Sequence, residues 1–256
     1  MPENASAEAA KISLVIGNHS HVGMVRPENE DYLGYYSHDG ADVVIVADGM
    51  GGHAGGKVAS RVAVETIRDV FLGASLDAEP LFEVMARALR AANLNIRTES
   101  AADARLKGMG ATCAIAAVRE GRLFHSHLGD CRVYFLRGGE LSRITKDHTV
   151  VQRLLDGGII TAEEAKVHPE KNIVSRALGG REDPEIDIPA EPIRLEVGDR
   201  FLLCSDGLFD LVTDEEILDI ASKNHPQEAC QKLVALANEK GGRDNVTVQI
   251  GLYTGP

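Results

Sequence analysis

Residues 43–48 (VVIVAD) constrain the fold of this chain more than any other segment, because every residue before the final aspartate is apolar. Successive side chains of a strand point to opposite faces, so a strand of this composition has to be covered on both sides. A glycine-rich loop follows at 49–56, and from Val58 onward the apolar residues recur at helical spacing. We therefore predict a strand buried between two layers, leading through a glycine loop into a helix.

The order of the other segments predicts an α+β fold. We expect strands at 12–21, 25–36, 111–118 and 122–130, a hairpin at 132–145 that turns at Gly138-Gly139, and strands at 192–212 and 245–253. Helices are expected at 58–71, at 81–96, after Thr213, which forms a capping box with Glu216, and at 226–242. Because these elements come in runs rather than in regular alternation, we expect antiparallel sheets with helices packed outside them. Glycine and proline interrupt the short helical pieces of residues 147–181, which we interpret as a flap insertion.

The composition disfavours several classes of protein. The chain of 256 residues has a formal net charge of −12 at pH 7, which disfavours a nucleic-acid partner because phosphate backbones attract clustered lysine and arginine. No apolar run reaches the roughly 20 residues of a membrane span, and the first residues lack the pattern of a secretory signal. The four cysteines, at 113, 131, 204 and 230, form no CxxC pair. We therefore expect a cytoplasmic protein without a membrane partner, with residues 1–11 disordered.

Acidic residues stand at strand boundaries, and a solvated surface is the simplest explanation for only some of them. The boundary acids are Glu30, Asp31, Asp48, Asp130, Asp206 and Asp244. An Asp-Gly pair most often marks a hairpin turn. For Asp206 that alternative stays open, with residues 208–212 as a short return strand. It is weaker for Asp48, because a helix follows.

If these carboxylates lie close together in the fold, bound metal ions are expected between them. Two like charges about 4 Å apart repel by roughly 4 kcal/mol at an effective dielectric constant near 20, and only protons or cations relieve that repulsion. Hard divalent cations such as Mg²⁺ and Mn²⁺ take oxygen ligands, chiefly carboxylates, carbonyls and water. If Asp48, Asp206 and Asp244 meet in one pocket, the sequence predicts a divalent metal centre with two ions.

Three other patterns suggest different sites. Residues 51–58 (GGHAGGKV) follow the spacing of a phosphate-binding P-loop, but Val58 stands where that loop needs a hydroxyl for Mg²⁺. His125 and His127 share one face of a strand, as a zinc pair would, although packed or solvent-facing histidines suit the surrounding sequence better. His168 precedes a proline in the flap and is expected on the surface.

Six motifs occur in the order and spacing of a known enzyme family. They are RPENED (26–31), VADGMGGHAGG (46–56), GMGATC (108–113), LGDCRVY (128–134), SDGLFD (205–210) and GGRDNVT (241–247). Together they resemble the motif series of the metal-dependent Ser/Thr protein phosphatases, the PPM or type 2C family, and DGMGGHAGG is similar to its bacterial branch. The resemblance covers residues 12–253 and implies a single phosphatase domain, a four-layer α-β-β-α sandwich of two antiparallel sheets flanked by helix pairs.

The resemblance also implies the ligands of a binuclear Mn²⁺ or Mg²⁺ centre. Asp48 would bridge both ions and the carbonyl of Gly49 would bind one of them, while Asp206 and Asp244 would bind the other. The remaining implied ligands are Glu30 and Asp31, acting mainly through water, and Asp130 with Asp210, at a weaker third ion.

For catalysis, the resemblance implies that Arg26 binds the substrate phosphate and that His53 protonates the leaving oxygen. Water bridging the two ions would attack phosphoserine or phosphothreonine directly. Phosphorylated proteins would be the substrates, a Ser/Thr kinase the partner, and the chain a monomer. Cys131 replaces the more usual serine at a position that is not a ligand. Two alternatives remain, namely an inactive phosphoprotein-binding relative, which would have lost a central acid, and a phosphatase for small phosphoesters.

Overall fold

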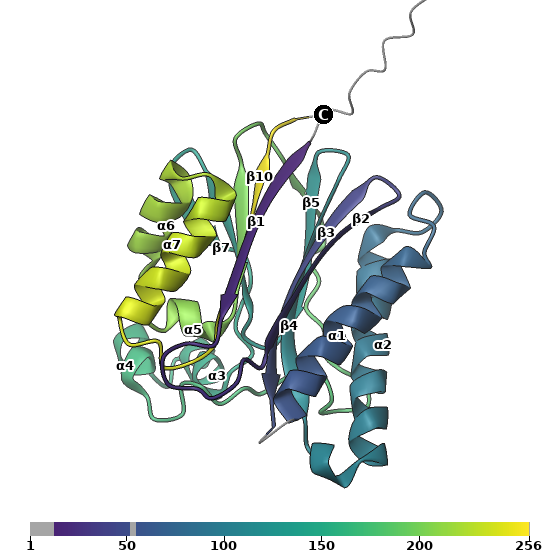
Figure 1. The fold of residues 1–256 in the computed structure, drawn as a ribbon, viewed down its shortest axis with the longest axis vertical. Helices are drawn as coiled ribbons and strands as arrows, with labels where there is room; N and C mark the ends of the chain where they lie inside the picture. The colour runs from purple at the N-terminus through teal and green to yellow at the C-terminus, as the bar shows by residue number, and fades with distance from the viewer. Residues whose placement is uncertain (1–12, 52–54, 256) are drawn as a thin grey trace, which may run out of the picture.

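The computed structural model describes residues 13–51 and 55–255, and two antiparallel sheets form its centre (Figure 1). The first sheet has the strand order β1-β10-β9-β6-β7, and the second has the order β2-β3-β4-β5-β8. The strands of the first sheet are β1 Leu14–His21, β10 Val246–Tyr253, β9 Arg200–Cys204, β6 Arg132–Arg137 and β7 Glu140–Arg143. Those of the second are β2 Asp31–His38, β3 Ala41–Met50, β4 Gly110–Arg119, β5 Arg122–Leu128 and β8 Ile193–Arg194.

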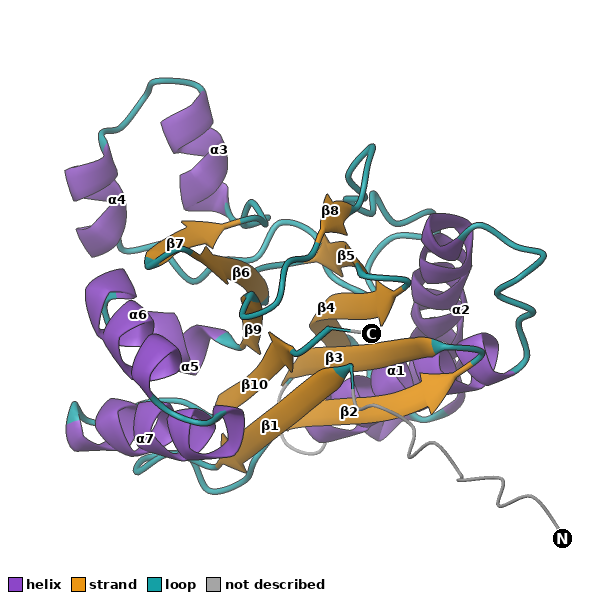
Figure 2. Ribbon diagram, turned by 90° about the horizontal axis from the view of Figure 1, so that it is seen from above, coloured by secondary structure: helices purple, strands orange, loops and turns teal. Residues whose placement is uncertain are grey.

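Helices cover the outer face of each sheet, and Figure 2 shows the layers from above. On the second sheet lie α1 (Gly55–Leu72) and α2 (Leu81–Ala102), followed by the 3-10 helix η1 (Ala104–Leu106). On the first sheet lie α6 (Asp214–Lys223) and α7 (Pro226–Glu239). The α+β prediction of a four-layer α-β-β-α sandwich is therefore confirmed.

The side chains of β3 explain why this strand needs a layer on each side. Val43 and Ile45 pack in the core beneath α1 and α2, whereas Val44 and Val46 pack in the core between the two sheets. The pleat of a strand places alternate side chains on opposite faces. The apolar run is thus buried on both faces, as predicted.

Several element boundaries differ from the prediction, and two of the differences lie beside the acids of the strand ends. β3 does not end at Asp48 but continues to Met50, because its pairing with β4 extends to Gly110. The residues after β9 form the short helix α5 (Asp206–Phe209) instead of a return strand. Leu208 lies in the core beneath α6 and α7, so the chain coils toward that core rather than turning back along β9.

Two local signals in the sequence are confirmed. Gly138 and Gly139 connect β6 and β7 with positive φ angles of 61° and 84°, as a tight hairpin turn requires. Thr213 and Glu216 form the capping box at the start of α6, where each side chain accepts a hydrogen bond from the main-chain N–H of the other residue. The local sequence alone therefore determines these two boundaries.

The flap at 147–181 contains two short helices, α3 (Val150–Asp156) and α4 (Ala162–Val167). An isolated β-bridge between Thr149 and Val174 closes its base. Figure 1 shows α3 and α4 at the same end of the sandwich as α5. The flap thus lies beside the end at which β9 passes into α5.

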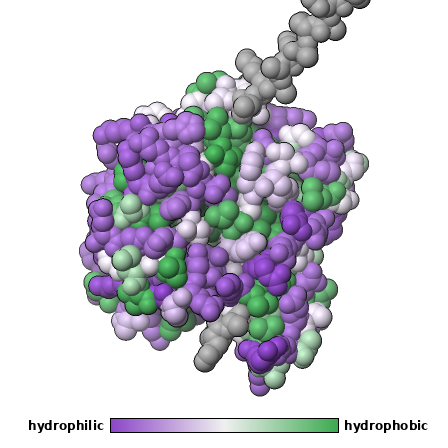
Figure 3. Space-filling model, viewed as in Figure 1, coloured by the Kyte–Doolittle hydropathy of each residue, from purple (hydrophilic) through white to green (hydrophobic). Residues whose placement is uncertain are grey.

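The surface over α6 and α7 is mostly hydrophilic, as Figure 3 shows. The apolar side chains of these helices face the sheet instead, for example Ile217 and Leu233, which are fully buried. None of the helices in the described residues is long and apolar enough to cross a membrane.

Gly17 of β1 lies against the first turn of α7, and we predict that Gly17→Ala destabilises the fold. A Cβ at this position would stand 2.2 Å from the main-chain nitrogen of Gln227 and from the main-chain carbon of Pro226. Because neither atom moves without shifting α7, we expect the free energy of unfolding to fall by about 1–3 kcal/mol in chemical denaturation. Gly73→Ala is the control, since its Cβ would meet nothing nearer than the Asp69 carbonyl oxygen at 3.4 Å. Unchanged stability of Gly17→Ala would contradict this packing.

Candidate metal centre

A row of polar residues crosses the second sheet at one end of the sandwich. Asp31 of β2 lies directly opposite Asp48 of β3, and Asp48 lies opposite Thr112 of β4. Residues two apart in a strand share a face, so Asp48 is on the side that Val44 and Val46 present to the first sheet. Two carboxylates are therefore held side by side between the sheets, an arrangement that is destabilising for like charges.

The first sheet supplies Asp206 at the same end. Asp206 begins α5, directly after Ser205 at the end of β9. The Ser205 hydroxyl donates to Asp31 Oδ2 at 2.7 Å, and its oxygen accepts from the main-chain N–H of Thr247 at 3.0 Å. Ser205 thus ties β9 and β10 to the start of β2, which brings Asp206 toward Asp31 and Asp48.

Asp244 and Arg26 form an ion pair next to these acids. Arg26 Nη2 donates to Asp244 Oδ2 at 2.7 Å. The following residue, Asn245, is buried and holds the loop that carries Arg26. Its Nδ2 donates to the carbonyl of Glu28 at 2.9 Å, and its Oδ1 accepts from the main-chain N–H of Glu30 at 2.8 Å. Asn245 therefore fixes the position of Asp244 relative to the Arg26 loop.

Asp130 follows β5 after a bend in the main chain. Gly129 has a φ of 104°, and a Cβ there would lie 2.3 Å from Cβ of Thr112, so the bend requires glycine. Thr112 also lies 3.1 Å from the sulfur of Cys131 through its Oγ1. Asp130 is buried, and its charge acts on both Asp48 and Asp206. The bend thus turns Asp130 toward the other acids.

Glu30 lies against α1 instead of between the sheets. A Cβ on Gly56, in the first turn of α1, would lie 2.7 Å from Glu30 Oε1. A Cβ on Gly49 would lie 2.0 Å from the carbonyl oxygen of Gly56. The glycines of this segment are therefore required by the close packing of α1 on β3, and the N-terminus of a helix favours a carboxylate such as Glu30.

Burial and mutual repulsion raise the pKa values of these acids. Burial is the larger cause, followed for Asp48 by the charge of Asp31 and for Asp206 by the charge of Asp130. The pKa values of Asp48 and Asp206 rise well above the usual range of aspartate, and those of Asp31 and Asp130 rise to about 6. Asp244 also raises the pKa of Asp48 and of Asp206. The carboxylates are therefore close enough to oppose one another's ionisation.

The donor atoms at this end of the sandwich suit a hard divalent cation. Asp31 Oδ1, Glu30 Oε1 and Asp206 Oδ1 are buried and have no hydrogen-bond partner within the described part of the chain. Buried oxygens without a partner are rare because they are costly, and carboxylate oxygens are the ligands that Mg²⁺ and Mn²⁺ prefer. The residues present therefore fit the kind of ion that the sequence predicts.

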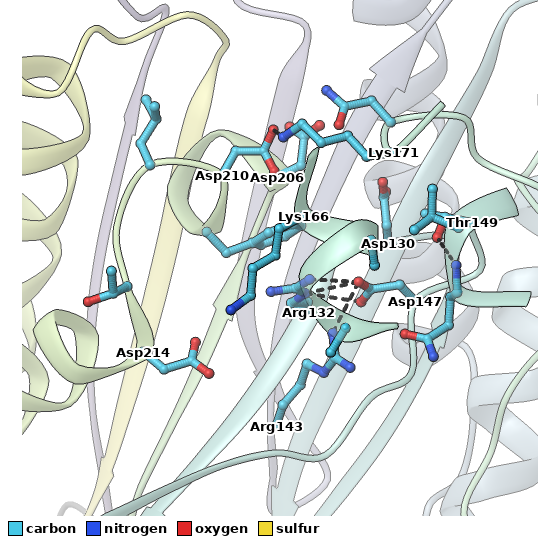
Figure 4. Close-up of a pocket in the computed structure, with 18 of the residues that line it drawn as sticks. Asp130, Arg132, Arg143, Asp147, Thr149, Lys166, Lys171, Asp206, Asp210 and Asp214 are labelled. Carbon is cyan, nitrogen blue, oxygen red and sulfur yellow. Dashed lines mark hydrogen bonds and ion pairs between the residues drawn. The ribbon is translucent and has the colours of Figure 1, made fainter. Parts of the chain in front are cut away.

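A cavity of about 770 Å³ opens between these acids, the flap and α6. Figure 4 shows Asp130, Asp206 and Asp210 among its lining residues. From the flap, Lys171 Nζ donates to Asp210 Oδ2 at 2.6 Å. A partly exposed ion pair of this kind contributes at most about 1 kcal/mol, so it does not bar a cation from Asp210.

Comparison with known proteins identifies the family. The family described as Protein phosphatase 2C matches residues 18–238 of the chain. The chain belongs to the protein phosphatase 2C family. The family named from the six motifs is thereby confirmed.

Two relatives and one solved structure show how far the similarity to the type 2C family extends. The serine/threonine protein phosphatase PstP of Mycobacterium tuberculosis is 40% identical over 247 residues, which cover 94% of this chain and 46% of PstP. The protein phosphatase PhpP of Streptococcus pneumoniae is 36% identical over 232 residues, 90% of this chain and 93% of PhpP. The catalytic domain of PstP, solved in complex with two manganese ions, has a TM-score of 0.80 at 38% identity and covers 94% of this chain and 98% of that one. The chain thus spans about half the length of PstP.

In this type 2C chain, the structure brings most of the predicted ligands together. The gathered acids are Asp31, Asp48, Asp130, Asp206 and Asp244. Asp210 lies beside them in the cavity wall, paired with the flap, and Glu30 lies on the α1 side of the group. The predicted proton donor His53 lies outside the described residues. The roles of these residues as ligands stay predictions.

Neutral residues that the sequence patterns did not single out hold the acids of the type 2C site in place. These are Thr112, which packs on Gly129, and Ser205 and Asn245, which precede α5 and β10. Ser205 and Asn245 stand next to an acid inside two of the six motifs, and that adjacency is the signal that could have drawn attention to them.

The two histidines of β5 are packed in the sandwich, as the favoured interpretation predicts. His125 and His127 are both buried. The ring of His127 stacks on that of His148, with a centroid distance of 4.6 Å. His127, His148 and Asp187 form a group of possible metal donors whose atoms lie within 4.8 Å of one another. This group shares no residue with the acids gathered between the sheets.

We predict that Asp206→Asn stabilises the metal-free protein at neutral pH, and progressively less as the pH falls toward 3.8, the usual pKa of aspartate. Burial, and then the charge of Asp130, raise the pKa of Asp206 in the folded state. Above pH 3.8 the folded protein therefore keeps a proton that the unfolded chain has lost, so stability falls as the pH rises through this range. Removing the charge therefore restores the stability that is lost in this range.

Thermal unfolding in EDTA at several pH values measures this effect. Asp183→Asn is the control, because the Asp183 side chain is 92% exposed. In saturating Mn²⁺ the order reverses, since the variant lacks a proposed ligand. If Asp206→Asn is no more stable than the parent protein in EDTA at neutral pH, the electrostatic description of the site is wrong.

Proposed function

We propose that this chain hydrolyses phosphoserine and phosphothreonine in proteins, with two Mn²⁺ or Mg²⁺ ions bound among the acids between the sheets. The gathering of carboxylates from both sheets beside Arg26 carries this proposal. Without cations such a group repels a phosphate, whereas with cations it becomes a site that attracts one. The names of the relatives PstP and PhpP support the same activity.

We infer that Asp48 would be a ligand of both ions, because it is buried between the sheets among acids from several elements. The charges of Asp31, Asp206, Asp130 and Asp244 all raise its pKa. The carbonyl of Gly49 is the proposed further ligand of one ion. Asp206 and Asp244 are the proposed ligands of the other.

The remaining acids are proposed as outer and third-ion ligands. Glu30 and Asp31 each have a buried oxygen without a partner in the described residues, which leaves it available to an ion or to water bound to an ion. Asp130 and Asp210 both line the cavity beneath the flap, which supports a weaker third ion at that place.

The side chains of this site divide the work of hydrolysis. When bound, the ions would supply a water of lowered pKa as the nucleophile and neutralise the charge of the phosphoryl group. Arg26 offers planar N–H donors to the phosphate oxygens, and its side chain is half exposed. Asp244 orients Arg26 by accepting from Nη2. His53 is the proposed proton donor to the leaving oxygen.

We infer the substrates, the partner and the location of the protein from the family and from the composition of the chain. Phosphorylated proteins are the proposed substrates, and the Ser/Thr kinase that modifies them is the proposed partner. The net charge of −12 supports the absence of a nucleic-acid partner. A single cytoplasmic domain at 12–253, acting as a monomer, remains part of the proposal.

Asp48→Asn and Asp206→Asn are each expected to lower hydrolysis of a phosphothreonine peptide in Mn²⁺ by more than about 100-fold, because each removes an ion ligand. Phosphate release with Mn²⁺ and with EDTA is the measurement, and Asp183→Asn is the control. A phosphotyrosine peptide and a sugar phosphate, assayed in parallel, test the substrate class. Full activity of either site variant, or of the parent protein in EDTA, would refute the proposal.

Arg26→Ala is expected to lower kcat/KM for the phosphothreonine peptide by about 10- to 100-fold, since a hydrogen bond to a charged group contributes about 1.5–3 kcal/mol. Arg243→Ala is the matched control, because Arg243 is an exposed arginine next to Asp244. Calorimetric titration with Mn²⁺ is run on both variants. Loss of the first two ions in Arg26→Ala would show that Arg26 serves the metal site and not the phosphate.

A further inference from the structure

His148 joins the start of the flap to the bend that carries Asp130. Its main-chain N–H donates to the Gly129 carbonyl at 2.9 Å, and the Gly129 N–H donates to Nδ1 of its ring at 3.0 Å. Its own carbonyl accepts from the N–H of Ser175, in the returning arm of the flap, at 2.7 Å. The residue is buried, at 6% exposed. His148 therefore contacts Gly129 twice and the far arm of the flap once.

These contacts determine where the proton of the His148 ring lies. A main-chain N–H can only donate, so Nδ1 carries the lone pair and Nε2 carries the proton. Nε2 lies 3.1 Å from Asp187 Oδ2, to which it donates. Asp187 in turn accepts from Arg176 Nη1 at 3.3 Å through its other oxygen. The ring is thus a neutral link between the main chain at Gly129 and a carboxylate.

The same arrangement argues against a metal ion among His127, His148 and Asp187. The His148 nitrogen that faces Asp187 carries a proton, and the Arg176 guanidinium lies 3.2 Å from it through Nη1. His127 Nε2 donates to the carbonyl of Lys146 at 2.8 Å, which leaves only its Nδ1 as a lone pair. A cation would meet a proton and a positive charge, so this group acts as a hydrogen-bonded brace.

The hydrogen-bonded group holds a bend whose main chain is constrained by close packing and by two hydrogen bonds. Gly129 packs so closely on Thr112 that it cannot carry a side chain. Its N–H is paired with the His148 ring and its carbonyl with the His148 main chain. Loss of a residue that orients a metal ligand without contacting the metal typically lowers metal affinity by about 10- to 100-fold. The orientation of Asp130, the next residue, therefore depends on His148.

We propose that His148 is a positioning residue that holds Asp130 for the third ion while fastening both arms of the flap. The proposal rests on the proposed role of Asp130 in metal binding. Because the acceptor is Nδ1, the two amides that can replace histidine are not equivalent. The side-chain oxygen of asparagine lies near the position of Nδ1 and still accepts the hydrogen bond from the Gly129 N–H. The longer glutamine side chain places its amide toward Asp187, so the hydrogen bond from Gly129 is lost.

The test compares His148→Asn with His148→Gln in the full chain. Titration with Mn²⁺, followed by calorimetry and by electron paramagnetic resonance, gives the affinity of each ion. We expect His148→Gln to weaken the third ion about 10- to 100-fold and His148→Asn to weaken it no more than about 3-fold. The affinities of the first two ions stay unchanged in both. His125→Gln is the matched control, because it replaces another buried histidine, one on β5 whose Nδ1 has no partner in the described residues.

A second readout needs no metal and separates this proposal from the proposed function. Hydrogen exchange of the Gly129 amide in EDTA is expected to be slow in the parent protein and in His148→Asn, and at least about 10-fold faster in His148→Gln. Equal third-ion affinities in the two variants, or equal loss in His125→Gln, would overturn the inference. If Gly129 exchange follows the expected order but no Mn²⁺ binds to the parent protein, the proposed function fails and the role of His148 in metal binding fails with it.

Discussion

Repulsion among carboxylates buried between two sheets is the constraint on which the functional end of this molecule depends. Asp31 and Asp48 face each other across a strand pair, and Asp206 approaches from the opposite sheet. Within the described residues these three acids make no ion pair, whereas Asp244 and Asp210, at the edge of the group, pair with Arg26 and Lys171. The structure thus gives Asp31 a neutral donor, the Ser205 hydroxyl, and leaves the charge of the three central acids for cations to balance.

The layer architecture follows from patterns that a single sequence shows. Because the side chains of the apolar run 43–47 point alternately to the two faces of the sheet, both faces have to be covered. The runs of strands and helices predict packed layers rather than a doubly wound parallel sheet. Local chemistry predicts the turn at Gly138-Gly139 and the start of α6. The helix α5 was not predictable in this way, because Leu208 turns toward a core built by α6 and α7, which come later in the chain.

The acids of the site were predictable one by one, since each stands at a strand boundary next to glycine or within a recognisable motif. The contacts that hold these acids in place were not predictable in the same way. Ser205 and Thr112 are common neutral residues, and their roles arise from contacts with residues far away in the chain, Asp31 in one case and Gly129 in the other. Adjacent acids also separate, because Asp31 points between the sheets while the Glu30 carboxylate lies against α1. Spacing in the sequence shows which residues bear charge, and the register between strands decides which of them meet.

The course of β10 has a practical consequence for work on this protein. The strand begins next to Asn245, beside the acids, and its eight residues end at Tyr253, near the carboxyl end of the chain in Figure 1. At about 3.3 Å per residue, the strand carries the chain about 26 Å from one end of the sandwich to the other. A fluorescent reporter or an affinity handle joined beyond Tyr253 therefore emerges at the opposite pole, where it leaves the approach to the acids unobstructed.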